Sequence, residues 1–167
     1  MAVPWTGFSF AKLAAKVGPR SEATHVRLVT FLDPENAPGQ KDQTWYPWPY
    51  YEGMTMAEAM NELTFLATGI YGHELPRQNG APWRLVLPWK YGFKSIKAMV
   101  KIEFTNLRPP TFWNTVAPDE YGFVANVDPE VPHPRWSQAR ERMIDTGEYV
   151  PTLEYNGYGE FVAKLYA

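Results

Sequence analysis

The residues with the clearest chemical potential lie in one stretch, 78–97, whose sequence is QNGAPWRLVLPWKYGFKSIK. Arg84 lies inside a short apolar run that predicts a strand over 83–87, between loops marked by glycine and proline. A guanidinium buried in a strand is costly unless an anion meets it, and its planar fork fits a phosphate or a carboxylate. Three more cations follow in the same stretch: Lys90, Lys94 and Lys97. The pattern therefore predicts an anion-binding loop.

The end of this stretch carries groups that suit a phosphate. Residues 92–97 offer backbone N–H groups, the hydroxyl of Ser95 and the ammonium of Lys97, which together can form a nest around an anion. Asn79 adds an amide that can both donate and accept. The alternative is structural: Arg84 would pair with a carboxylate of the protein, and the lysines would form a solvated face. Spacing alone leaves both interpretations open.

Four further blocks accompany this stretch, with the sequences MAVPWTGF at 1–8, TMAEAMNELTFLATGIYG at 55–72, APDEYGF at 117–123 and HPRWSQARER at 133–142. The five blocks resemble, in one order, the sulfite oxidase-like family of molybdopterin-binding oxidoreductases. Within it they are most similar to the branch that reduces protein methionine sulfoxide. A lone Gly-x-Pro-x-Arg motif would carry little weight, whereas this resemblance covers nearly the whole chain.

The resemblance implies contacts with a molybdenum–molybdopterin cofactor at six positions, which are Thr30, Asn79, Arg84, Ser95, Ile96 and Lys97. Asn79 and Arg84 match family positions that hold the pterin, and residues 95–97 match the loop that grips its phosphate. Thr30 matches a further contact at the end of an expected strand over 25–31. The alternative for Thr30 is an ordinary β-favouring residue of that strand.

The resemblance also implies an activity. It is that of a molybdenum oxidoreductase acting by oxygen-atom transfer, which reduces methionine sulfoxide in proteins or another S- or N-oxide. A membrane haem-binding subunit would supply electrons, and the full-length family member would be periplasmic. Sulfite oxidation is the alternative chemistry. No residue is assigned as catalytic, and none as a metal ligand.

The chain contains no cysteine. In the resembling enzymes one cysteine thiolate binds molybdenum, and it lies a few residues upstream of the segment that matches Met1. A thiolate is the soft ligand that this chemistry requires. We therefore expect one oxidoreductase molybdopterin-binding domain over 1–167 that is incomplete at its N-terminus. A start codon assigned too late, a fragment, or a diverged protein without catalysis would each explain this, and the alternative function is a non-catalytic cofactor-binding or scaffold fragment.

Composition narrows the class of protein. With 167 residues and 45% hydrophobic content, the chain is long enough for one domain with a core. A formal net charge of −2 without a basic stripe argues against a nucleic-acid partner. No apolar run approaches the roughly 20 residues of a membrane span, so no transmembrane segment is expected. Residues 1–10 lack the pattern of a signal peptide, so the chain as given is expected to be cytoplasmic.

Hydrophobic spacing predicts an α+β fold, with short helices and long loops around a mixed sheet. One helix is expected over 8–17. A second begins with a capping box between Thr55 and Glu58 and is expected to run to about Glu62. Strands are expected at three places: 25–31, 83–87 and 97–105.

A cluster at 133–136, His-Pro-Arg-Trp, precedes an expected short helix over 137–143. It would line a substrate entrance or a partner surface, or simply anchor the fold. Asp119 and Glu120 form an acidic pair for which solvation or a salt bridge is expected. A histidine-based metal centre is not expected, because no metal-ligand spacing links the three histidines, His25, His73 and His133.

Overall fold

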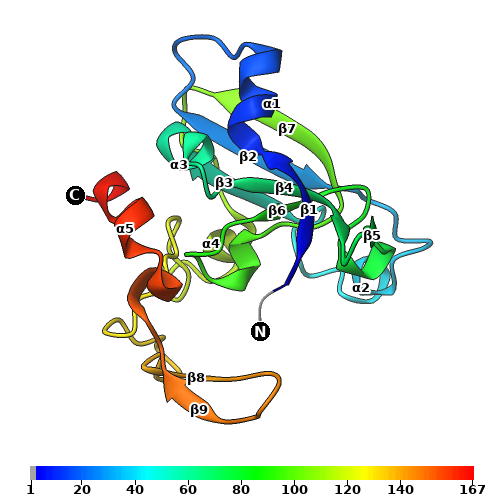
Figure 1. Ribbon diagram of the computed structural model, residues 1–167. Helices are drawn as coiled ribbons and strands as arrows, with labels where there is room; N and C mark the ends of the chain where they lie inside the picture. Colours follow the sequence, from blue (N-terminus) through cyan, green and yellow to red (C-terminus); the bar gives the residue numbers. More distant parts are fainter. Residues whose placement is uncertain (1–2) are drawn as a thin grey trace.

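A computed structural model describes residues 3–167, and its body contains two antiparallel sheets (Figure 1). The first sheet has the order β3-β2-β7, with bounds Tyr51–Thr55, His25–Thr30 and Met99–Thr105. The second has the order β1-β4-β5, and β6 also pairs with β4; their bounds are Trp5–Ser9, Phe65–Ile70, His73–Glu74 and Arg84–Val86. A separate hairpin pairs β8 (Arg140–Arg142) with β9 (Tyr149–Pro151).

The helices are short and lie around these sheets (Figure 1). The α-helices are α1 (Phe10–Val17), α2 (Pro38–Asp42), α3 (Met56–Met60), α4 (Phe112–Val116) and α5 (Gly159–Val162). Single 3₁₀ turns are η1 (Arg77–Asn79), η2 (Gly92–Lys94), η3 (Glu154–Gly157) and η4 (Ala163–Leu165). The expected α+β class, with short helices and long loops, is confirmed. The expected mixed sheet is corrected: the strands form two sheets and a hairpin, and every pair of neighbouring strands among the described residues is antiparallel.

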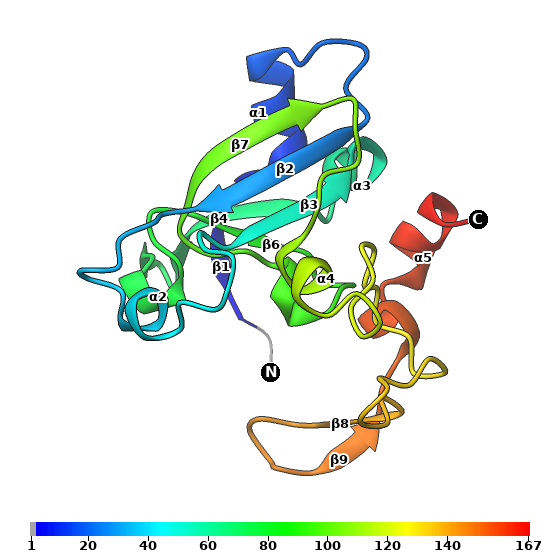
Figure 2. The same ribbon diagram turned by 180° about the vertical axis from the view of Figure 1, so that it is seen from behind.

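Helix α1 covers one face of the β3-β2-β7 sheet, whose other face is turned toward the viewer in Figure 2. Phe10 and Ala14 are buried one turn apart, which is the spacing of a helix face. The helix ends at Gly18, whose φ of 66° suits glycine and whose N–H donates to the Ala14 carbonyl at 2.9 Å. The expected start at residue 8 is wrong, because Phe8 pairs with Leu66 in the β1–β4 ladder.

The predicted capping box at α3 is confirmed. The Thr55 hydroxyl accepts from the Glu58 N–H at 3.1 Å, and the Glu58 carboxylate accepts from the Thr55 N–H at 2.8 Å. The helix stops at Met60 rather than near residue 62, because Asn61 takes an extended conformation. The Asn61 amide oxygen then accepts from the Leu63 N–H at 2.9 Å and turns the chain toward β4.

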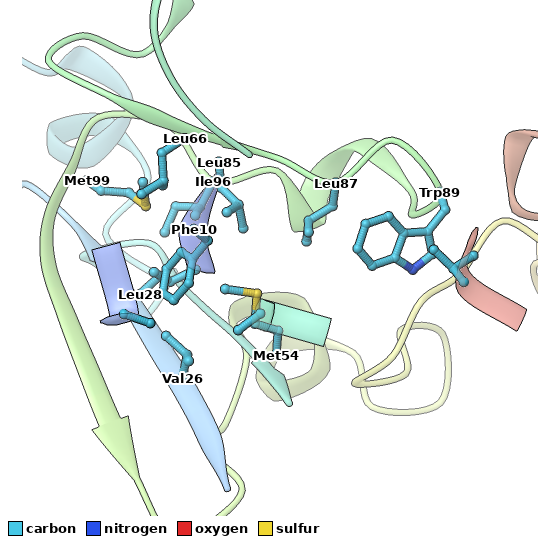
Figure 3. Packing of buried hydrophobic residues seen from close by; sticks show 13 residues of the cluster. Phe10, Val26, Leu28, Met54, Leu66, Leu85, Leu87, Trp89, Ile96 and Met99 are labelled. Carbon is cyan, nitrogen blue, oxygen red and sulfur yellow. The ribbon is translucent and has the colours of Figure 1, made fainter. Parts of the chain in front are cut away.

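The core joins the two sheets, and its members are shown in Figure 3. Phe10 of α1 packs in one buried cluster with Leu28 of β2 and Leu66 of β4. Leu87 lies between these residues and the fully buried Trp89, so the core extends along the stretch that follows β6 (Figure 3). This packing fixes the position of the 78–97 stretch against both sheets.

The three expected strands are confirmed as β2, β6 and β7, the last beginning at Met99.

The helix expected over 137–143 is wrong, because β8 occupies this segment and pairs with β9. The reversal between these strands contains Gly147 with a φ of 75°, and the Met143 N–H donates to the Glu148 carbonyl at 2.8 Å. Pairing across this turn outweighs the local helical preference. Over residues 3–167, the helices are all too short or too polar to cross a bilayer.

Candidate cofactor-binding site

Arg84 opens β6, and its side chain is half-buried. Its guanidinium makes long hydrogen bonds to the carbonyls of Asn79 (3.3 Å) and Ser95 (3.4 Å), and it lies 4.9 Å from the centre of the Trp5 ring. Within residues 3–167, no carboxylate lies within 4.0 Å of it. Burial lowers the pKa of Arg84 from its ordinary value. The structural pairing with a carboxylate is therefore absent here, and the guanidinium can accept an external anion.

Gly80 lets two loops meet beside this guanidinium. A Cβ at Gly80 would lie 2.9 Å from the Lys97 Cβ and 3.0 Å from the Arg84 Cβ, and its φ of 113° favours glycine. The Ala98 N–H donates to the Gly80 carbonyl at 3.0 Å, and the exposed Lys97 ammonium donates to the Gln78 carbonyl at 2.9 Å. The side chains of Arg84 and Lys97 therefore begin at backbone positions that lie side by side.

Ser95 and Ile96 lie in the turn between these cations. Their N–H groups already donate within the turn, from Ser95 to the Gly92 carbonyl (3.1 Å) and from Ile96 to the Lys94 carbonyl (3.0 Å). The structure thus corrects the expectation of free N–H groups at both positions. The Ser95 hydroxyl accepts from the Leu87 N–H at 3.1 Å, which leaves its own proton available to a ligand. The Ile96 side chain is buried in the core, so only its backbone could contact a ligand.

Thr30 ends β2 and pairs with Met99 at the start of β7. The next residue, Phe31, donates its N–H to the Ala98 carbonyl at 3.4 Å, so Thr30 lies near the chain that leaves Lys97. The Thr30 side chain is largely buried, and its hydroxyl is 3.2 Å from the Tyr50 carbonyl. The six predicted positions thus come from three segments that adjoin one another: the end of β2, 79–84 and 95–97.

Lys94 does not face an external anion, and the structure corrects this part of the prediction. Its ammonium is buried and pairs with the Glu52 carboxylate at 2.6 Å. It also donates to the carbonyls of Gly53 (2.7 Å) and Phe123 (2.8 Å). All three ammonium protons therefore have acceptors, and the lysine fastens η2 to β3.

Lys90 is a second buried anchor of the same stretch. Its ammonium pairs with Glu58 of α3 at 2.5 Å and also donates to the Val124 carbonyl and the Asn126 side chain, both at 2.8 Å. Burial alone would raise the pKa of Glu58, but the charge and hydrogen bonds of Lys90 hold that pKa below its ordinary value. Neither lysine belongs to a solvated face. Both hold the turn that leads into residues 95–97.

The cluster at 133–136 is anchored by stacking. The His133 and Trp136 rings are 3.6 Å apart and nearly parallel. The expected salt bridge at Glu120 is confirmed, because its carboxylate lies 2.7 Å from the Arg135 guanidinium. Across residues 3–167 no group of three or more histidine or acidic side chains is placed to hold a metal ion.

Comparison with known proteins identifies the family to which a chain with this fold and these candidate cofactor-binding residues belongs. The model of the oxidoreductase molybdopterin-binding domain family matches residues 1–113, and the chain belongs to this family. The expected family is therefore confirmed.

A relative narrows the comparison. The chain is 54% identical over 170 residues to the protein-methionine-sulfoxide reductase catalytic subunit MsrP of Burkholderia mallei, a match that covers 99% of this chain and 51% of that protein. The chain thus spans about half the length of this relative. The sulfane dehydrogenase SoxCD of Paracoccus pantotrophus has a similar fold, with a TM-score of 0.51 and 16% identity over 89% of this chain and 29% of that chain.

Sequence reasoning missed three residues of the site. Trp5 lies beneath the Arg84 guanidinium, and its only signal was its place in the first of the five similar blocks. Glu52 and Glu58 hold the two buried lysines. Their partnership joins positions 32 and 42 residues apart, a separation that local patterns cannot reveal.

Proposed function

We propose that this chain forms the phosphate- and pterin-binding part of a molybdopterin-dependent oxidoreductase that reduces methionine sulfoxide in proteins. The observation that carries the proposal is the half-buried Arg84, which has no carboxylate partner among residues 3–167 and adjoins the exposed Lys97 across Gly80. A guanidinium and an ammonium at one cradle are the groups that neutralise a phosphate. The 54% identity to a methionine-sulfoxide reductase subunit supports the substrate class.

The residues present fit this cofactor at its phosphate end. Arg84 and Lys97 would neutralise the phosphate, and the Ser95 hydroxyl would donate its free proton to it. Asn79 and Thr30 would orient the pterin, and the Ile96 backbone would complete the loop. When bound, the cofactor supplies the molybdenum chemistry of oxygen-atom transfer. The chain has no cysteine, so a thiolate for the metal would come from protein outside residues 1–167.

The proposal extends to partners and location. The matched relative is described as a catalytic subunit, which supports a separate subunit that delivers electrons. We propose a membrane haem-binding protein for that role and the periplasm as the place of action. In this proposal residues 1–167 belong to one domain that is completed by the part bearing the metal thiolate.

A second candidate is a cofactor-binding protein without catalysis, which the absence of cysteine favours. The two are distinguished by turnover with the full-length protein, which includes the part bearing the metal thiolate, purified from a host that makes the cofactor. A reduced viologen dye with a peptide containing methionine sulfoxide tests reduction, and sulfite with ferricyanide tests the alternative chemistry. The proposal predicts sulfoxide-dependent dye oxidation alone. Bound pterin without turnover of either substrate would replace it by the second candidate, and sulfite-dependent turnover would replace the substrate.

A further inference from the structure

A cavity of about 590 Å³ lies beside η2, and none of the six predicted cofactor contacts lines it. Its walls come from η2, the loop over 120–138 and the start of η3. Six of its lining residues have aromatic rings: Tyr91, Phe93, Tyr121, His133, Trp136 and Tyr155. The cavity is therefore a separate feature that the cofactor proposal does not use.

Four of these rings form a continuous wall. Phe93 meets Tyr121 edge to face at 5.3 Å, and Tyr121 lies 5.3 Å from His133. His133 then stacks on Trp136 at 3.6 Å. The His133 side chain is more than nine-tenths buried, and its Nε2 atom makes no hydrogen bond in the described part of the chain, although the Glu120 carboxylate lies 3.4 Å from it. Such a group is expected to face a ligand or a water.

The charged residues that line the cavity are acidic. Its lining includes the carboxylates of Glu120, Asp128 and Glu154, and no lysine or arginine among residues 3–167 lines it. Arg135 pairs with Glu120 at 2.7 Å and lies 5.1 Å from the centre of the Trp136 ring, whereas Asp128 and Glu154 form no ion pair among residues 3–167. Burial, followed by the charges of Glu154 and Asp128, raises the pKa of the Tyr155 hydroxyl. An anion or an apolar group would not use these carboxylates.

We propose that this cavity binds a basic side chain, a lysine or an arginine, presented by a partner protein segment. Ring faces attract an ammonium or guanidinium group, and nearby carboxylates add to that attraction. The cavity is large enough for such a side chain together with part of its backbone. Charge complementarity selects this occupant, and the proposal is independent of cofactor binding because the two sets of residues do not overlap.

The test compares each cation with a neutral molecule of the same shape. Nα-acetyl-lysine and Nα-acetyl-arginine methylamides are titrated into the 167-residue protein at low salt, and the corresponding norleucine and citrulline methylamides serve as neutral probes. Binding is followed by the NMR signal of the Trp136 indole N–H, assigned with Trp136→Phe. We expect at least about fivefold tighter binding of either cation than of its neutral counterpart.

Two variants locate the effect. The double substitution Asp128→Asn and Glu154→Gln should weaken cation binding by about five- to tenfold, because it removes the charge and keeps the shape. Glu148→Gln, an exposed carboxylate outside the cavity, should leave binding unchanged. Thermal unfolding confirms that each variant is folded. Equal affinity for charged and neutral probes, or equal affinity in the double variant, would overturn the proposal.

Discussion

At the scale of single residues, Gly80 most directly limits the cofactor cluster. A Cβ there would lie at 2.9 Å from the Lys97 Cβ and 3.0 Å from the Arg84 Cβ, in a backbone conformation that disfavours other residues. Gly80→Ala should therefore lower the cofactor content and reduce the free energy of unfolding by about 1–3 kcal/mol. Fluorescence of released pterin and urea unfolding measure the two effects.

The control for this variant is Gly39→Ala, since Gly39 has open space around it and lies in α2. That substitution should leave the pterin content unchanged. If both variants lose the same amount of pterin, the close approach at Gly80 does not determine cofactor binding.

Glu58 gives the folded protein a defined response to acid. Its pKa in the folded state lies below its ordinary value of 4.5: burial would raise the pKa, but the charge of Lys90 together with the hydrogen bonds from Lys90, Thr55 and Tyr166 outweighs that effect. The carboxylate therefore stabilises the fold fully above about pH 4.5, and this contribution is lost as the pH falls through the folded pKa. Urea unfolding at about pH 7 and about pH 3 should show a steeper loss in the wild type than in Glu58→Gln. Parallel losses would contradict the buried pair as a source of stability.

At the scale of elements, the buried pair of Lys94 and Glu52 holds η2 to β3. Removal of one partner leaves a buried charge without compensation, so Lys94→Met should cost about 3–5 kcal/mol in the free energy of unfolding. The matched substitution Lys101→Met breaks an exposed pair with Glu103 and should cost less than about 1 kcal/mol. Urea unfolding compares them, and similar costs would show that Lys94 does not anchor the turn.

The elements that sequence predicted best are those with strong local signals. Helix α1 was predicted from hydrophobic spacing over 8–17, and the α3 capping box from Thr55 and Glu58. The hairpin of β8 and β9 was missed, because its strands have three residues each and depend on pairing across a turn. Strand β1 was partly assigned to a helix for the same reason, since its partner β4 lies far along the chain.

In the candidate site, too, the sequence predicted what local patterns reveal and missed what depends on residues far along the chain. Arg84 was predicted to need an anion because an arginine in an apolar strand has few other roles, and it has no carboxylate partner within residues 3–167. The same logic placed Lys90 and Lys94 at the anion, where the structure has buried pairs instead. The sequence shows how many cations a loop carries. Which of them are buried depends on carboxylates far along the chain, such as Glu52 and Glu58, with which they pair.

At the scale of the whole molecule, the last residues of the chain pack against the core: Val162 belongs to the buried cluster, and Leu165 and Tyr166 contact it. Val162 is fully buried, and the Tyr166 hydroxyl donates to Glu58 at 2.7 Å and accepts from the Trp89 indole at 2.8 Å. Tyr166→Phe leaves the indole N–H without its acceptor and should reduce the free energy of unfolding by about 1–3 kcal/mol. Tyr158→Phe, at a more exposed position, is the control for urea unfolding. Equal effects would show that the C-terminal contact contributes nothing specific.

The central claim for the whole molecule is that it holds a molybdopterin through Arg84. The most direct measurement is fluorescence of pterin released from the 167-residue protein after purification from a cofactor-making host, together with elemental molybdenum. The account predicts pterin in the wild type, its loss in Arg84→Ala, and its retention in Arg20→Ala, a change at an exposed arginine of the turn after α1. The same pterin content in Arg84→Ala as in the wild type, or none in any of the three, would contradict the account.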